Sequence, residues 1–229
     1  MRCIATALWL LLTVLGSGEA QAGGLSVLPT RLDFGPGRSV QSVLLTNVSD
    51  QTVTVETELL VWSEGNPAQL ANDIVITPAV VTMPPNQRVR VRVGLLRPNG
   101  DAIERAYRLY FTELPAPVPL PGVGLGVRLR IGIPVFVPPA QPQPGVLTWT
   151  FKRDTDPPQL EARNDGNVHL RLASPRLVAA GVLQPLTQPI PYVLARSSLS
   201  LALPAPLQAG SRVRWLDGDD ERESAVAQP

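Results

Sequence analysis

The chain is poor in the side chains on which most enzymes and metal sites depend. Its 229 residues include one cysteine, Cys3, and one histidine, His169. A zinc site built from spaced cysteine and histidine ligands is therefore excluded, and a serine–histidine–aspartate triad would have to use His169. That histidine lies in NDGNVHLRL, where its neighbours alternate like a strand leaving a turn, so we interpret it as structural. We expect no catalytic residue, no cofactor and no enzymatic activity.

Metal, phosphate and nucleic-acid sites also lack support in the sequence. The tightest carboxylate clusters are Asp154 with Asp156 and the aspartates within 217–220, and neither has the glycine and terminal glutamate of a calcium-binding loop. No glycine-rich segment is typical of a loop that cradles phosphate. Lys152 is the only lysine, and the formal net charge is +1. The chain therefore has no electrostatic handle for nucleic acid or for an anionic membrane.

The first 22 residues predict a secretory signal peptide. Arg2 supplies the positive start, residues 4–15 form a short apolar run, and the motif AQA at 20–22 is a small-x-small cleavage site. We expect cleavage after Ala22, which removes Cys3 and leaves an exported chain that starts near Gly23. Without disulfides, the exported protein must rely on its cores, and residues 23–229 suit two domains of about 100 residues each.

Helical periodicity is missing too, whereas 25 prolines and 18 glycines punctuate short β-branched runs, which indicates an all-β chain. Seven runs in the first half match an immunoglobulin-like sandwich. They cover residues 25–34 with a break at Pro29, 39–47, 53–62, 74–83 with a break at Pro78, 89–93, 106–114 and 122–137.

A proline-rich connector at 139–144 divides the chain into domains at 23–138 and 145–217. Shorter strand candidates in the second half predict a second, smaller β-sandwich. They cover residues 146–151, 159–164, 169–179, 190–194, 198–203 and 211–216. The acidic and small residues of 218–229 predict a disordered tail.

The stretch 122–137 is the most informative. One parity is aliphatic throughout, and the other is mostly glycine and arginine. The aliphatic parity comprises Val123, Leu125, Val127, Leu129, Ile131, Ile133, Val135 and Val137. A period of two puts them on one face of a strand, and Pro134 with the glycines favours an edge position. A long apolar edge strand invites pairing with another chain. The alternative is an ordinary strand whose aliphatic face fills its own core.

Several ordered segments resemble the periplasmic chaperones of the chaperone–usher pilus pathway. They are LPTRLDF, LLTNVSDQTVTVET, ITPAVVTMPPNQRVRVRV, YRLYFTELP, IGIPVFVPP and NDGNVHLRL, which recur in the family's order over essentially the whole mature chain. The details IPVFV and NDGNVHLRL are most similar to the archaic branch, which is associated with spore-coat-U-type pilins. The resemblance implies two immunoglobulin-like domains arranged as a boomerang.

The resemblance also implies a mechanism. The chaperone would donate its seventh strand to the groove of a pilin subunit and deliver the subunit to an outer-membrane usher, and it could self-associate when free. The groove-filling side chains would be Val123, Leu125, Val127, Leu129, Ile131 and Ile133. Arg31 matches the family arginine that holds the subunit's C-terminal carboxylate. The family's second base, a lysine late in the seventh strand, is not matched, and Arg130 or Arg128 could replace it only through a bulge or a shifted register.

Other interpretations remain for the sequence alone. A structural or adhesive two-domain surface protein would use 122–137 as ordinary core. An exported hydrolase or sugar-binding module lacks a catalytic constellation, and Trp62, Trp149 and Trp215 are too dispersed for an aromatic platform.

Overall fold

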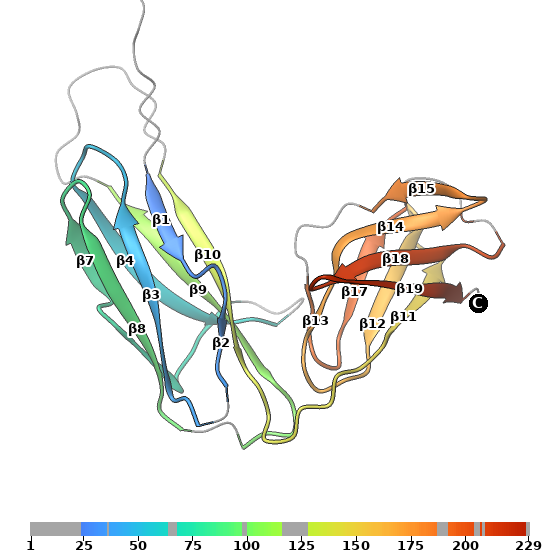
Figure 1. Cartoon of the computed structure of the whole chain (residues 1–229), viewed down its shortest axis with the longest axis horizontal. Helices are drawn as coiled ribbons and strands as arrows, with labels where there is room; N and C mark the ends of the chain where they lie inside the picture. The colour runs from blue at the N-terminus through green and yellow to red at the C-terminus, as the bar shows by residue number, and fades with distance from the viewer. Residues whose placement is uncertain are drawn as a thin grey trace, which may run out of the picture.

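The computed structural model describes residues 24–35, 37–63, 68–97, 100–115, 128–186, 192–203, 207 and 209–227. Every regular element in these ranges is a β-strand. Figure 1 shows two β-sandwiches set at an angle and joined by a single connector. The predicted all-β fold with two immunoglobulin-like domains is confirmed. The described residues contain no helix of the length and apolarity that a membrane crossing requires.

Two sheets form the N-terminal domain. The four-stranded sheet has the order β1 (Leu25–Leu28), β3 (Val40–Asn47), β8 (Arg88–Leu95) and β6 (Ile74–Thr77). The other has the order β2 (Leu32–Asp33), β10 (Arg130–Val137), β9 (Arg105–Leu114), β4 (Val53–Val61) and β5 (Gln69–Leu70), with β7 (Val80–Met83) also paired to β4. Period-two alternation directs the aliphatic parity of each strand into a shared core.

The chain changes sheets at the two prolines where the sequence predicts interruptions. β1 pairs with β3, but beyond Pro29 the chain crosses to the other sheet, where β2 runs parallel to β10. In the same way β6 pairs with β8, and beyond Pro78 β7 pairs with β4. Proline cannot donate to a ladder, so each crossing falls where the hydrogen bonding is interrupted anyway. Because β2 is only two residues long, it covers little of β10.

The C-terminal domain is a second sandwich. Its main sheet has the order β15 (Val182–Pro185), β14 (Ala173–Ala179), β18 (Arg212–Asp217), β19 (Asp220–Ala227), β11 (Leu147–Lys152), β12 (Gln159–Asn164) and β17 (Ser198–Ala202). A further pair joins β13 (Leu170–Arg171) to β16 (Tyr192–Val193). The core is built around Trp149, Leu160 and Leu177, none of which exposes more than 1% of its surface.

The expectation of a disordered tail over 218–229 is wrong for the described part, because Asp220–Ala227 is strand β19. It forms a hairpin with β18 and runs parallel to β11. The acidic residues that suggested a solvated tail lie opposite arginines of β18: Glu223 faces Arg214, and their closest N–O distance is 2.9 Å. Cross-strand pairs of opposite charge therefore stabilise this strand, which lacks the apolar alternation by which the other strands were predicted.

Each domain has a fully buried asparagine at the end of a strand. The Nδ2 of Asn47 donates to the carbonyls of Gln51, Met83 and Pro84 at 2.7–3.1 Å. The Nδ2 of Asn164 likewise donates to three carbonyls at 2.8–3.1 Å, those of Val168, Val193 and Leu194. Buried carbonyls need hydrogen-bond donors, and these two side-chain amides supply them where the chain leaves the sheet.

Candidate functional site

An open strand edge lies along β10. β9 pairs with its whole length, but on the other side β2 reaches only Val135 and Phe136. No described strand pairs with that side between Arg130 and Pro134. The amide of Phe34 donates to the carbonyl of Phe136 at 2.9 Å, so the even-numbered residues direct their backbone groups toward this side. The free edge therefore presents the N–H and C=O groups of Arg130 and Gly132, and the carbonyl of Pro134.

The aliphatic parity of β10 divides between two environments. Ile133, Val135 and Val137 are at most 2% exposed and belong to the domain's own core, whereas Ile131 is partly buried at its margin. Leu129 precedes the strand and is also only partly buried, while its carbonyl accepts the amide of Glu113 at 2.9 Å. The remaining predicted groove-filling residues, Val123, Leu125 and Val127, lie outside the described residues. Within the described range, the odd-numbered aliphatic side chains thus leave the domain core between Ile133 and Leu129.

An aromatic cluster connects the domains at the other end of β10. The ring of Phe136 stacks on His169, with centroids 3.6 Å apart and an interplanar angle of 12°. Tyr192 lies 5.3 Å from Phe136, and Trp62 contacts both rings at 6.0–6.1 Å. His169 therefore has a packing role at the domain junction.

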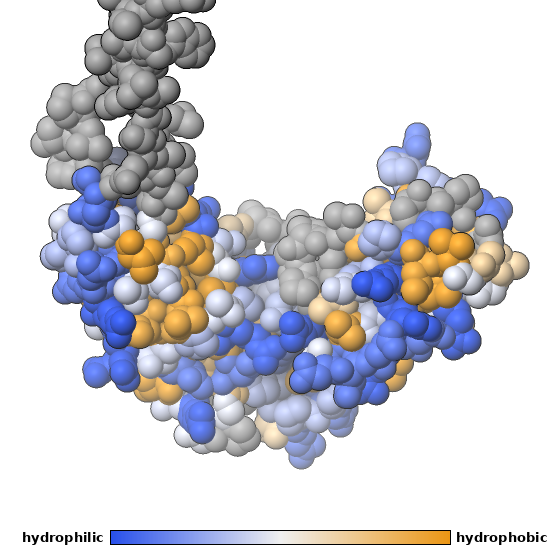
Figure 2. Space-filling view, turned by 45° about the horizontal axis from the view of Figure 1, so that its top comes forward, coloured by the Kyte–Doolittle hydropathy of each residue, from blue (hydrophilic) through white to orange (hydrophobic). Residues whose placement is uncertain are grey.

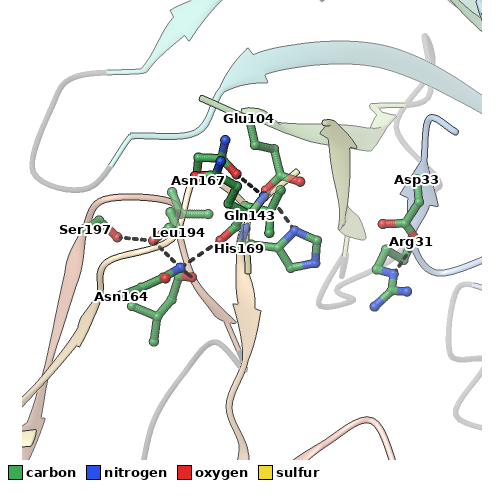
Figure 3. Close-up of polar contacts among 11 residues, drawn as sticks. Arg31, Asp33, Glu104, Gln143, Asn164, Asn167, His169, Leu194 and Ser197 are labelled. Carbon is green, nitrogen blue, oxygen red and sulfur yellow. Dashed lines mark hydrogen bonds and ion pairs between the residues drawn. The ribbon is translucent and has the colours of Figure 1, made fainter. Parts of the chain in front are cut away.

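Polar contacts hold the same junction, as Figure 3 shows. The carboxylate of Glu104, whose side chain is 4% exposed, accepts the backbone amide of His169 and contacts its Nδ1, both at 2.8 Å. The side chain of Asn167 donates to the carbonyls of Ala102 and Gln141 and accepts the amide of Gln143. One turn of the second domain thus contacts both the first domain and the connector.

Arg31 lies between the two domains, and Figure 3 shows it apart from this junction. Its Nε is 2.6 Å from Oδ2 of Asp33, and its side chain is 40% exposed. Burial lowers the pKa of Arg31, but hydrogen bonding to Tyr192 and the charge of Asp33 outweigh burial, and the pKa ends above its ordinary value. The guanidinium therefore lies at the cleft and already has a carboxylate partner.

Arg130 and Arg128, the two candidates for the second base, are arranged differently from Arg31, and so are three further arginines of the domain. Arg130 projects from the outer face of the sheet, 4.2 Å above the ring of Tyr110 and 3.7 Å from Glu58. Arg128 is exposed and precedes β10, at the far end of the strand from Phe136. The arginines at 88, 90 and 92 lie on β8, in the opposite sheet.

Sequence reasoning missed Arg108, which also faces the cleft. Its guanidinium carbon lies 3.8 Å from the ring centroid of Trp62. The neighbouring Tyr107 and Leu109 are buried in the core, so the alternation places Arg108 on the outer face of β9. The pattern YRLYF contained this signal, but only the fold shows that Trp62 lies beside it.

The surface between the domains is mostly hydrophilic, whereas hydrophobic patches lie over each domain (Figure 2). No group of three or more histidine, cysteine or acidic residues with metal-binding geometry occurs in the described ranges. The candidate site thus has two parts. One is the open edge of β10, and the other is the neighbouring cleft, where Arg31 and Arg108 lie beside the rings of Trp62 and Tyr192.

The N-terminal domain is thus an immunoglobulin-like sandwich in which one side of β10 has no described partner strand between Arg130 and Pro134. Residues 24–143 match the family model of pili and flagellar-assembly chaperones, PapD N-terminal domain. The match covers more than half of the chain, and the protein belongs to this family. Its members are chaperones rather than enzymes.

Solved structures have the same fold. The chaperone–tip adhesion subunit pre-assembly complex CsuC–CsuE, from the archaic Csu pili of Acinetobacter baumannii, matches with a TM-score of 0.68 and 17% identity, over 90% of this chain and 99% of that one. The SafB chaperone–SafA pilin complex of Salmonella enterica gives 0.68 and 14%, over 90% and 97%. The periplasmic chaperone SfaE gives 0.61 and 14%, over 89% and 99%. A search of curated protein sequences finds no match.

Proposed function

We propose that this protein captures pilin subunits by donating the edge of β10, with the segment before it, to an incomplete subunit sandwich. The observation that carries the proposal is the open edge at Arg130–Pro134, where the aliphatic row leaves the domain core. Strand addition uses backbone hydrogen bonds for affinity and alternate side chains for pocket filling. Two similar structures, CsuC–CsuE and SafB–SafA, are complexes of a chaperone with a subunit.

The driving force comes from the odd-numbered side chains. Those in the proposed contact are Leu129 and Ile131, together with Val123, Leu125 and Val127 of the preceding segment. Burying four or five of them contributes roughly 6–15 kcal/mol before costs, at 1.5–3 kcal/mol each. Lost rotational freedom and ordering of side chains offset much of this. Capture therefore needs no nucleotide.

Arg31 serves as an anchor for the subunit's C-terminal carboxylate. Its planar guanidinium can make two charge-assisted hydrogen bonds to one carboxylate. The ion pair with Asp33 occupies Nε, so a ligand carboxylate would bind the terminal nitrogens, beside the hydroxyl of Tyr192. The bound subunit then passes to an outer-membrane usher, whose next subunit replaces the chaperone strand.

The proposal includes the cellular setting. The signal peptide at 1–22 is cleaved after Ala22, the protein acts in the periplasm, and its resemblance is to the archaic branch. When no subunit is bound, the open β10 edges of two copies can pair and protect each other.

Co-expression in the periplasm with a pilin subunit tests the function. Wild-type chain should recover the subunit in a one-to-one complex without added nucleotide. Arg31→Ala should melt within a few degrees of wild type and recover much less subunit, because the side chain lies outside the hydrophobic core but its charge anchors the ligand. Arg31→Lys should restore part of the loss, since it keeps the charge without the two-pronged geometry. Full recovery by Arg31→Ala would contradict the anchor.

A further inference from the structure

A cavity of about 530 Å³ lies at the end of the N-terminal sandwich from which the connector leaves. Three segments that are far apart in the sequence supply its walls. They are the turn within 35–39, the end of β8 with the residues after it at 95–97, and the end of β10 with the connector within 137–142. The volume lies within the range of small-molecule sites, about 300–1,000 Å³. None of the residues assigned to subunit capture lines this cavity.

Backbone hydrogen bonds hold two of these walls together. The amide of Arg38 donates to the carbonyl of Gly35 at 3.1 Å, which closes the turn. Gly37 within this turn has a φ of 70°, a conformation that favours glycine. The amide of Leu95 donates to the carbonyl of Ser39 at 2.7 Å and joins the turn to the end of β8. The cavity is therefore preformed, which lowers the cost of ordering it around a ligand.

The interior of the cavity is apolar. Phe34 and Val137, each 2% exposed, are core residues that also form part of the wall. Pro139 of the connector is buried beside them. Leu96 lines the cavity as well but is 64% exposed. A hydrocarbon chain in the cavity therefore removes apolar surface of the protein from water, in addition to its own.

The charge along the cavity has one sign. The lining includes two arginines, Arg38 and Arg97, and no acidic residue. Both side chains are exposed, and neither forms an ion pair within the ranges that the structure describes. By contrast, Arg31, Arg105 and Arg130 each pair with a carboxylate of their own domain. An apolar cavity with positive charge alone at its lining favours an amphipathic anion.

We propose that this cavity binds a medium-chain fatty carboxylate, with the hydrocarbon chain against the apolar walls and the carboxylate at Arg38 and Arg97. A guanidinium matches a carboxylate because its planar fork makes two charge-assisted hydrogen bonds. Pro139 and Pro142 belong to the connector, so the bound chain also contacts the segment that joins the two domains. The site is separate from the open β10 edge, and this inference goes beyond the proposed function.

Titration calorimetry of the purified chain with dodecanoate, below the concentration at which micelles form, tests the site. Saturable one-to-one binding is expected. Butanoate has the same head group but a short chain, and it should bind far more weakly, because each buried methylene group contributes roughly fourfold in affinity. Dodecyltrimethylammonium has the same hydrocarbon chain with the opposite charge, and it should bind about 10-fold more weakly or less.

Two variants and a control locate the binding. Ala140→Trp places a large ring in the cavity from the exposed connector and should abolish dodecanoate binding, while the chain melts close to wild type. The double variant Arg38→Gln/Arg97→Gln should weaken dodecanoate about 4- to 25-fold, at about 2- to 5-fold for each exposed charge, without weakening dodecyltrimethylammonium. Arg90→Gln removes an exposed charge of β8 that does not line the cavity and should leave binding unchanged.

Three results would each overturn the proposal. They are the absence of saturable dodecanoate binding, equal affinity for the anionic and the cationic chain, and undiminished binding by Ala140→Trp. Capture of pilin subunits is measured separately, so the failure of this site leaves the proposed function intact.

Discussion

The border between the domain's own core and the strand that we propose is donated can be located by comparing Leu129→Ala with Ile133→Ala. Both residues lie on the aliphatic parity, four positions apart. Ile133 is 2% exposed and packs in the core, whereas Leu129 precedes β10 and is only partly buried. The same chemical truncation should therefore act on folding at one position and on binding at the other.

The magnitudes follow from these environments. Removing a buried isoleucine side chain costs about 2–5 kcal/mol of unfolding free energy, which lowers the melting temperature of a domain of this size by roughly 8 °C or more. Removing Leu129 deletes one groove-filling side chain worth about 1.5–3 kcal/mol, so capture should weaken roughly 10- to 150-fold. Its effect on melting should be small.

Melting of the purified chain and titration with a pilin subunit give the two readouts. Leu129→Asp is the stronger variant, because it would bury an unpaired charge in the subunit groove while the free chaperone stays folded. If Leu129→Ala destabilises the free protein as much as Ile133→Ala does, or captures pilin as well as wild type, the assignment of Leu129 to the donated segment is refuted.

Three further outcomes follow from described contacts. Gly132→Ala should destabilise the domain by about 1 kcal/mol, since a Cβ there would lie 2.7 Å from the ring of Tyr110; chemical denaturation measures the change. Asn167→Ala should separate the melting of the two domains into distinct calorimetric transitions, because it deletes two hydrogen bonds to the connector and one to Ala102 of the first domain. Burial and a hydrogen bond to Asp73 raise the pKa of Tyr107. Above about pH 10 the unfolded chain therefore ionises first, stability falls as pH rises, and Tyr107→Phe should flatten that fall in alkaline melts.

The local sequence pattern was sufficient to predict most strands of the N-terminal domain and the points where they are interrupted. The breaks at Pro29 and Pro78 follow from the missing amide of proline, and the structure places a change of sheet at each. The parity of β9 and β10 follows from period-two alternation of aliphatic residues. These features depend on residues that are neighbours in sequence, which is why a single chain reveals them.

The features that sequence missed depend on distant partners. β19 has few apolar residues, and its pairing depends on arginines of β18 and on β11, some 70 residues earlier in the chain. The alternation assigns Arg108 to an outer face of the sheet. Its contact with Trp62 and its interaction with Tyr192 of the other domain become visible only in the fold. Alternation assigns a side chain to a face and carries no information on what covers that face.

The two parities of the β10 region have complementary physical roles. The aliphatic parity fills the domain core up to Ile133 and is free of it from Leu129. On the other parity, Gly132 leaves room for the ring of Tyr110, and Arg130 covers that ring. A slip of one residue in pairing with a subunit would present glycine and arginine to the subunit's apolar groove. In the proposed strand donation, the alternation therefore excludes pairings that are shifted by an odd number of residues. It also makes the other face too polar to pair unspecifically with a second apolar sheet.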